Sequence, residues 1–163
     1  MESYTKLTTI LSWFNLVIAS ILVLTGLISS LTMGSIPLLL AVLLLGSAII
    51  LHSYACLQLK KSIIHPEIPL GHQTPVGVRF MGYVALFFAF LNLVNSVTAL
   101  QHTDEFVKQV ILPANAPKVN LRGMLRGVAI FTILFSLTIL LNVYLNLRLL
   151  RWYQLQTRNP DQK

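Results

Sequence analysis

Charged residues are excluded from long stretches of this sequence, and this exclusion limits what the chain can fold into. No Asp, Glu, Lys or Arg occurs from Leu7 to Leu59, from Phe80 to Thr103 or from Gly127 to Leu147. Hydrophobic residues make up 55% of the chain and charged residues 10%, whereas a soluble domain is typically about 25% charged. A water-soluble fold of 163 residues leaves too much surface exposed to hide this composition. We therefore expect an integral membrane protein.

The lengths of the uncharged runs predict the number of helices. A transmembrane helix needs roughly 20 apolar residues, so the second and third runs suit one span each. The first run suits two spans, because "TMGSIP" (32–37) combines helix-breaking Gly and Ser with a Pro suited to the next first turn. We predict an all-α membrane protein, a four-helix bundle forming a single domain. Its helices are Leu7–Leu31, Ile36–Lys60, Val78–Leu100 and Leu121–Trp152, with loops at 61–77 and 101–120 and a tail at 153–163.

The positions of the basic residues predict the orientation. If both termini are cytoplasmic, that side carries eight Lys and Arg residues and the opposite side carries four, as the positive-inside rule favours. Because these residues flank helices, the net charge of +7 indicates contact with anionic lipid and not with nucleic acid. The predicted outer loops contain no N-x-[ST] acceptor, which is compatible with a bacterial inner (plasma) membrane. The eight are Lys6, Lys60, Lys61, Arg79, Arg148, Arg151, Arg158 and Lys163, and the four are Lys108, Lys118, Arg122 and Arg126.

Small residues recur at helical spacing on the first and third predicted helices. In lipid, helices associate through close packing, so small residues mark helix–helix contacts. The two helices also align, "FNLVIAS" (14–20) with "LNLVNSV" (91–97), as do "YACLQLKK" (54–61) and "YLNLRLLR" (144–151). This indicates two tandem helical hairpins, the alternative being that apolar helices simply resemble each other. The packing stripe consists of Ser12, Ala19, Gly26, Gly82, Ala85, Ala89 and Ser96.

Asparagine and histidine are the main polar groups inside the predicted spans. Proton relays and ion pathways normally place ionisable residues there, and His52 alone qualifies in this sequence. We expect His52 to bond a neighbour such as Asn142 or Asn146. The asparagines either join helices, at on the order of 1 kcal/mol per hydrogen bond, or line a narrow polar path. The full set is Asn15, His52, Asn92, Asn95, Asn142 and Asn146.

The stretch "IHPEIPLGHQTP" (64–75) separates the two predicted hairpins. His65, Glu67 and His72 are potential metal ligands, but their spacing matches no metal motif. Each proline fixes φ and pushes the preceding residue into extended geometry, so we predict a stiff connector. Thr74 is the expected cap of the helix that follows. The connector is also a predicted docking loop for a cytoplasmic partner, formed by His65, Pro66, Glu67, Pro69, His72 and Pro75.

The motifs of most enzyme classes are missing from the sequence. There is no H-E-x-x-H and no Gly-rich phosphate loop, and His52 and Ser53 point about 100° apart on a helix. We therefore expect a non-catalytic polytopic membrane protein without a cofactor, an accessory or structural subunit of a larger membrane complex. Its expected partners are membrane lipid and other membrane subunits or further copies of itself. The alternatives are a small transporter or homo-oligomeric pore for a small solute, and a lipid- or heme-handling membrane enzyme.

Overall fold

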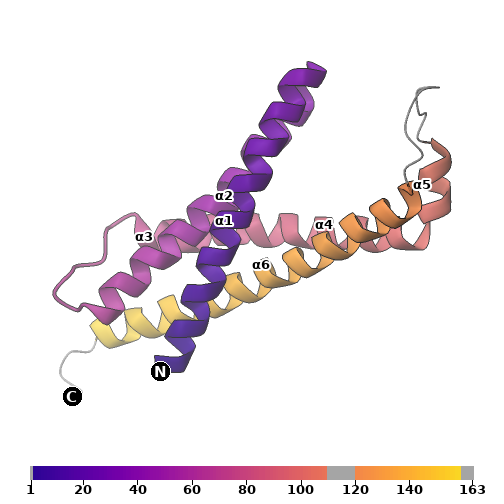
Figure 1. The fold of residues 1–163 in the computed structure, drawn as a ribbon. Coiled ribbons are helices and arrows are strands. Elements are labelled where there is room, and N and C mark those ends of the chain that lie inside the picture. Colours follow the sequence, from indigo (N-terminus) through magenta and orange to yellow (C-terminus); the bar gives the residue numbers. More distant parts are fainter. Residues whose placement is uncertain (1, 110–119, 159–163) are drawn as a thin grey trace.

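The computed structural model describes residues 2–109 and 120–158, and the described chain is helical with short connections (Figure 1). Four of its helices are long and apolar enough to cross a membrane. This confirms the predicted all-α, four-helix membrane bundle. The elements are α1 (Glu2–Met33), α2 (Ile36–Ile64), α3 (Thr74–Val76), a π-helical turn η1 (Gly77–Met81), α4 (Gly82–Gln101), α5 (Thr103–Gln109) and α6 (Leu121–Arg158).

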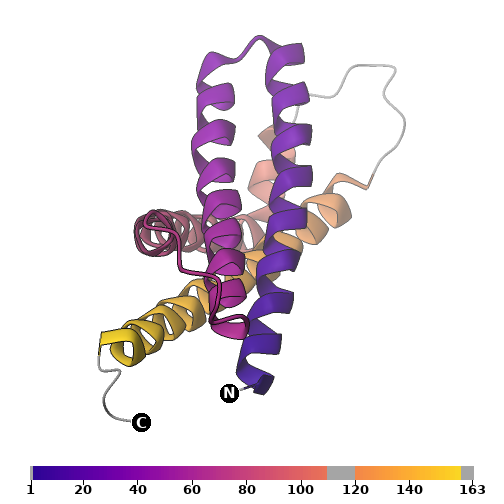
Figure 2. The ribbon, with the colours of Figure 1, turned by 90° about the vertical axis from the view of Figure 1, so that its left-hand side faces the viewer.

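The four long helices pack as two hairpins, α1 with α2 and α4 with α6 (Figures 1 and 2). The turn of the first hairpin forms where the sequence predicts it. Gly34 has a φ of 63°, a conformation that L side chains rarely adopt, and the Ser35 hydroxyl accepts the Leu38 N–H at 3.4 Å. The predicted tandem hairpins are therefore present.

Glycines allow the helices of the first hairpin to approach closely. A Cβ added to Gly46 would lie 1.9 Å from Val23 Cγ2, and one added to Gly26 would lie 2.8 Å from Val42 Cγ2. The predicted packing stripe is thus used inside the chain itself. Gly26 is half-buried, and the other members are buried: Ser12, Ala19, Gly82, Ala85, Ala89 and Ser96.

The two hairpins cross near their middles, where small residues let the helices meet. Toward the chain termini the hairpins stay in contact, and toward the Gly34 turn and α5 they diverge (Figures 1 and 2). We call these two parts the terminal end and the far end. The cluster at the crossing combines Ala19, Ile49, Ala85, Ala89, Phe135, Ile139 and Val143.

Several helices are longer than the hydropathy pattern predicts. α1 begins at Glu2, α2 runs to Ile64, and α6 extends through the first part of the predicted tail to Arg158. Tertiary contacts explain the extensions. The Tyr4 hydroxyl donates to the Leu145 carbonyl at 3.0 Å, and Ile63 and Tyr153 pack on a buried cluster of α2, η1 and α6 residues. The rest of the tail, 159–163, lies outside the described residues.

The connections between the hairpins and at the far end follow the prediction in part. Thr74 is the first residue of α3 and not its cap, since Gln73 occupies that position. The predicted loop at 101–120 begins with a short helix, α5, over Thr103–Gln109. Arg122 at the start of α6 hydrogen-bonds Asp104 and holds the pKa of that carboxyl below its usual value, which ties α5 to α6.

Replacing Gly46 with alanine is expected to destabilise the first hairpin by about 1–3 kcal/mol, because the added methyl overlaps Val23. Gly127→Ala is the matched control, since its added Cβ would lie more than 4 Å from any described atom beyond its own helix turn. Unfolding in mixed detergent and SDS, followed by circular dichroism, measures both free energies of unfolding. Equal stability of the two variants would contradict the close packing of α1 on α2.

Candidate functional site

A chain of hydrogen bonds runs through the interior of the terminal end and links three helices. Lys60 on α2 donates to the Thr8 carbonyl at 2.5 Å and to Ser12 Oγ at 2.7 Å. Ser12 donates to Asn142 Oδ1 at 3.0 Å, and Asn146 Nδ2 donates to the same oxygen at 2.8 Å. Because an ammonium group only donates, the Ser12 hydroxyl must accept a hydrogen bond from Lys60 and donate one to Asn142. The donors from Ser12 and from Asn146 therefore converge on Asn142 Oδ1.

Lys60 is buried, although its position in the sequence predicts a charge that flanks the membrane. Its side chain is 2% exposed, while that of Lys61 is exposed. α2 continues past Lys60 to Ile64, so this lysine lies inside the helix and faces α1. The spacing of His52, Cys56 and Lys60, four residues apart each time, places all three on one face of the helix and was the available signal.

Two further contacts join α1 to α6. The Thr138 hydroxyl donates to Asn15 Oδ1 at 2.9 Å, and the Asn15 amide approaches the Thr138 carbonyl at 3.4 Å. Tyr4 bonds the Leu145 carbonyl about two turns farther along α6. Asn15 thus joins the two hairpins, which is one of the two roles predicted for the asparagines.

His52 contacts a different partner from the asparagines expected for it. Its Nδ1 lies 3.2 Å from the Val78 carbonyl, and its Nε2 lies 3.4 Å from Cys56 Sγ. Since a carbonyl only accepts, the geometry fits a proton on Nδ1 and leaves Nε2 to accept from the thiol. The π-helical turn brings Val78 to α2, and Gly82 gives the ring space, because a Cβ there would lie 3.0 Å from it.

Some buried polar atoms have no partner within the described residues. They are Ser53 Oγ, Ser136 Oγ, Asn142 Nδ2 and Asn146 Oδ1. An unpaired buried polar group costs about 1–3 kcal/mol of stability. A water molecule bound beside one of these atoms would therefore stabilise the bundle by satisfying its hydrogen bond. The two asparagine atoms lie at the end of the Lys60–Ser12–Asn142 chain.

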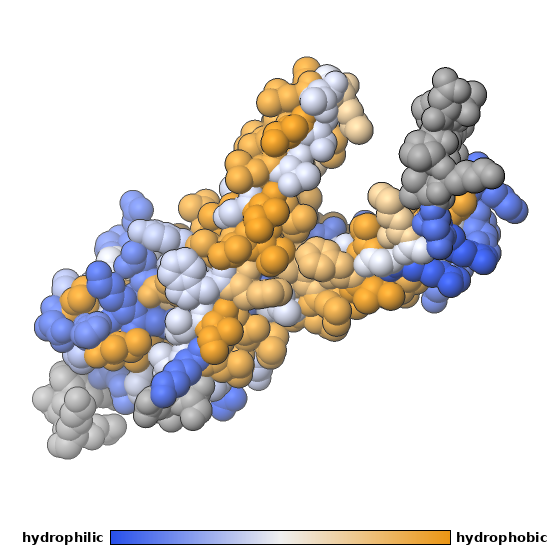
Figure 3. Space-filling model, viewed as in Figure 1, coloured by the Kyte–Doolittle hydropathy of each residue, from blue (hydrophilic) through white to orange (hydrophobic). Residues whose placement is uncertain are grey.

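A second feature is an apolar cleft of about 380 Å³ between the diverging hairpins. Figure 3 shows the apolar surface of both hairpins where they separate. Asn92 lines this cleft, half-buried, and its amide makes no hydrogen bond within the described chain. The other lining residues are Ala19, Leu22, Val23, Val42, Leu45, Gly46, Ile49, Val128, Phe131, Thr132 and Phe135.

The remaining candidates lie on the surface. Asn95 is exposed, and its side chain has no hydrogen-bond partner in the described chain. In the connector, His65 Nδ1 lies 3.2 Å from Glu67 Oε1, and both side chains are exposed. Among the described residues no three His, Cys, Asp or Glu side chains are placed to hold a metal ion, so His72 does not join this pair. The docking role of the connector stays a prediction.

Comparison with protein-family models, with curated proteins and with solved structures found no match for this chain. The assignment of a function therefore depends on the geometry of the polar interior and of the cleft.

The hydrogen bond between Ser12 and Asn142 is expected to couple the hairpins energetically. In a double-mutant cycle of Ser12→Ala and Asn142→Leu, we expect a coupling of roughly 0.6–1.7 kcal/mol, as found for polar pairs between membrane helices. Asn95→Leu serves as the control, since the exposed Asn95 amide has no partner to lose. Additive effects of the two substitutions on the free energy of unfolding would show that this contact does not join the hairpins.

Proposed function

We propose that this protein is a non-catalytic accessory subunit whose cleft receives a transmembrane helix of another membrane protein. The observation that carries the proposal is Asn92, whose amide lines an apolar cleft without a hydrogen-bond partner in the described chain. An unsatisfied polar group at membrane depth costs several kcal/mol, because lipid tails offer no donor or acceptor. A polar side chain on a partner helix would remove that cost.

The difference between Asn15 and Asn92 supports this proposal. The two residues align in the tandem hairpins, yet Asn15 is 1% exposed and bonded to Thr138, whereas Asn92 has no hydrogen-bond partner among the described residues. The first hairpin therefore uses its asparagine to bind the second hairpin, and the second leaves its asparagine at an open surface. A helix from outside the chain would give Asn92 the contact that α6 gives Asn15.

The lining of the cleft suits a helix in chemistry and position. Leu22 and Phe131 line the cleft and supply apolar contact area. Leu22 is 45% exposed and Phe131 is 45% exposed, so both have surface left to bury.

A photocrosslinking amino acid at Leu22 tests the occupant of the cleft in the native membrane. We expect a crosslink to one polypeptide, which native mass spectrometry of the gently extracted complex then finds in fixed stoichiometry. The matched control is the same crosslinker at Leu24, which is 62% exposed and does not line the cleft. A crosslink only to lipid or to a second copy would overturn the heteromeric assignment.

Asn92→Leu is expected to weaken the complex about fivefold, the loss of roughly 1 kcal/mol of hydrogen bonding between membrane helices. Asn95→Leu makes the same chemical change outside the cleft and should leave the complex intact. Equal effects of the two substitutions, read as the fraction of protein bound to its partner, would remove Asn92 from the interface.

A small transporter is the second candidate, and the unpaired Asn142 Nδ2 and Asn146 Oδ1 favour it. In a transporter, water would reach these atoms through the bundle. In a Cys56→Ala background, we expect N142C to stay inert toward a water-soluble thiol reagent, because Asn142 is 1% exposed. Labelling of N142C, with Leu141→Cys on the exposed apolar face remaining unlabelled, would favour the transporter and contradict a closed polar interior.

A further inference from the structure

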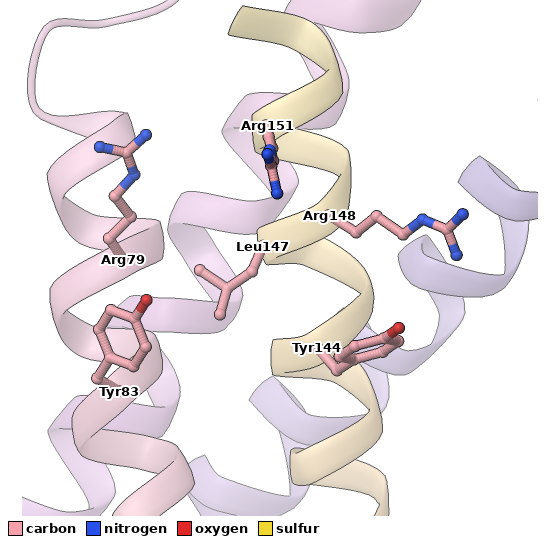
Figure 4. Close-up of a pocket in the computed structure, with 6 residues that line it drawn as sticks. All are labelled: Arg79, Tyr83, Tyr144, Leu147, Arg148 and Arg151. Atoms are coloured by element: carbon pink, nitrogen blue, oxygen red, sulfur yellow. The ribbon is translucent and has the colours of Figure 1, made fainter.

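The terminal end carries a groove of about 670 Å³ over the surface of α6, beside η1 and α4 (Figure 4). Arg79 and Tyr83 border one side, and Tyr144 and Arg148 lie on the other side of Leu147 (Figure 4). Arg151 stands next to Leu147 along α6. Each Arg–Tyr pair is four residues apart, so each pair lies on one face of its helix.

The arginines of the groove have no acidic partner among the side chains that the structure describes. The described carboxylates are engaged elsewhere, Glu67 with His65, Glu105 with His102 and Asp104 with Arg122. Arg79 Nη2 donates to Gln154 Oε1 at 2.5 Å, and that amide is neutral. Arg79, Arg148 and Arg151 are all exposed, so their charges are accessible to a ligand. The groove therefore concentrates positive charge and offers many N–H donors.

The position of the groove indicates which class of anion it binds. It lies at the end of two spanning segments, Thr74–Gln101 and Leu121–Thr157, where a membrane passes from hydrocarbon to headgroups. Tyrosine is enriched at this depth because its ring is apolar and its hydroxyl is polar. Farther along α6, Leu141 and Leu137 are about half exposed and suit acyl chains. A molecule with a phosphate at one end and hydrocarbon at the other matches both parts.

We propose that this groove binds the headgroup phosphate of an anionic phospholipid, with Arg79 and Arg151 as the main ligands. The guanidinium group presents a planar fork of donors that matches phosphate oxygens in pairs. Tyr83 adds a hydroxyl donor beside Arg79, and Leu147 forms the apolar floor. Basic pockets between membrane helices recognise anionic headgroups in this way. The inference is independent of the partner proposed for the cleft, because the two sites lie on different parts of the bundle.

Native mass spectrometry of the delipidated full chain, titrated with phosphatidylglycerol, tests the proposal. We expect retained phosphatidylglycerol adducts and weaker adducts with neutral phosphatidylcholine. The double substitution R79Q/R151Q is expected to lower phosphatidylglycerol binding about thirtyfold, because each lost arginine contributes about 1 kcal/mol at the membrane surface. The single substitution R151Q, a milder change on an exposed side chain, should give a smaller loss in the same direction.

The control K6Q/K61Q removes the same charge from exposed lysines at the same end, outside the groove. Equal losses in the control and in R79Q/R151Q would overturn the proposal, because they would indicate general surface attraction. Unchanged phosphatidylglycerol binding in R79Q/R151Q would overturn it as well. A final titration adds inorganic phosphate to the lipid-bound protein. Displacement of the lipid by inorganic phosphate at comparable concentration would overturn the proposal and assign the groove to a soluble phosphate compound.

Discussion

The hydrogen bond from Ser12 to Asn142 connects the two hairpins through two fully buried side chains, and the relative placement of the hairpins depends on it. Ser12 also accepts from Lys60, so one hydroxyl links α1, α2 and α6. Bonds in such a chain polarise one another, which strengthens each of them in a medium of low dielectric constant. In lipid there is little hydrophobic drive between helices, so polar bonds and close packing must decide which faces meet.

The placement of these bonds explains why the hairpins separate. On α1 the bonds to α6 come from Tyr4, Ser12 and Asn15, all in the half nearest the N-terminus. Past the small residues at the crossing, the structure gives no side-chain hydrogen bond between the hairpins among the described residues. The described polar side chains in that part of α1, such as Ser20 and Thr25, bond their own helix backbone instead. One end is thus fixed, and the other end keeps apolar surface for lipid or protein.

The sequence predicts the features that depend on local chemistry. The uncharged runs specify four helices, and Gly34 with Ser35 specifies the first turn, because both follow from hydropathy and backbone preference. The partner of His52 could not be derived in this way, since it depends on a π-helical turn that brings the Val78 carbonyl to α2. Lys60 was misplaced for a related reason. Hydropathy locates a lysine at the end of an apolar run, but only the extension of α2 to Ile64 places it inside the bundle.

The buried Lys60 also limits what the polar interior can do. It meets a carbonyl and a hydroxyl, and no carboxylate is recorded beside it in the described chain. A cation in this position favours electron-rich neighbours and repels other cations, so a path for metal cations or protons past Ser12 is unfavourable. The same argument applies at the membrane surface, where the arginines of the α6 groove lie at the same end as Lys60. The positive charge of the terminal end therefore supports the proposed binding of anionic lipid, and the neutral character of the cleft supports the proposed binding of a partner helix.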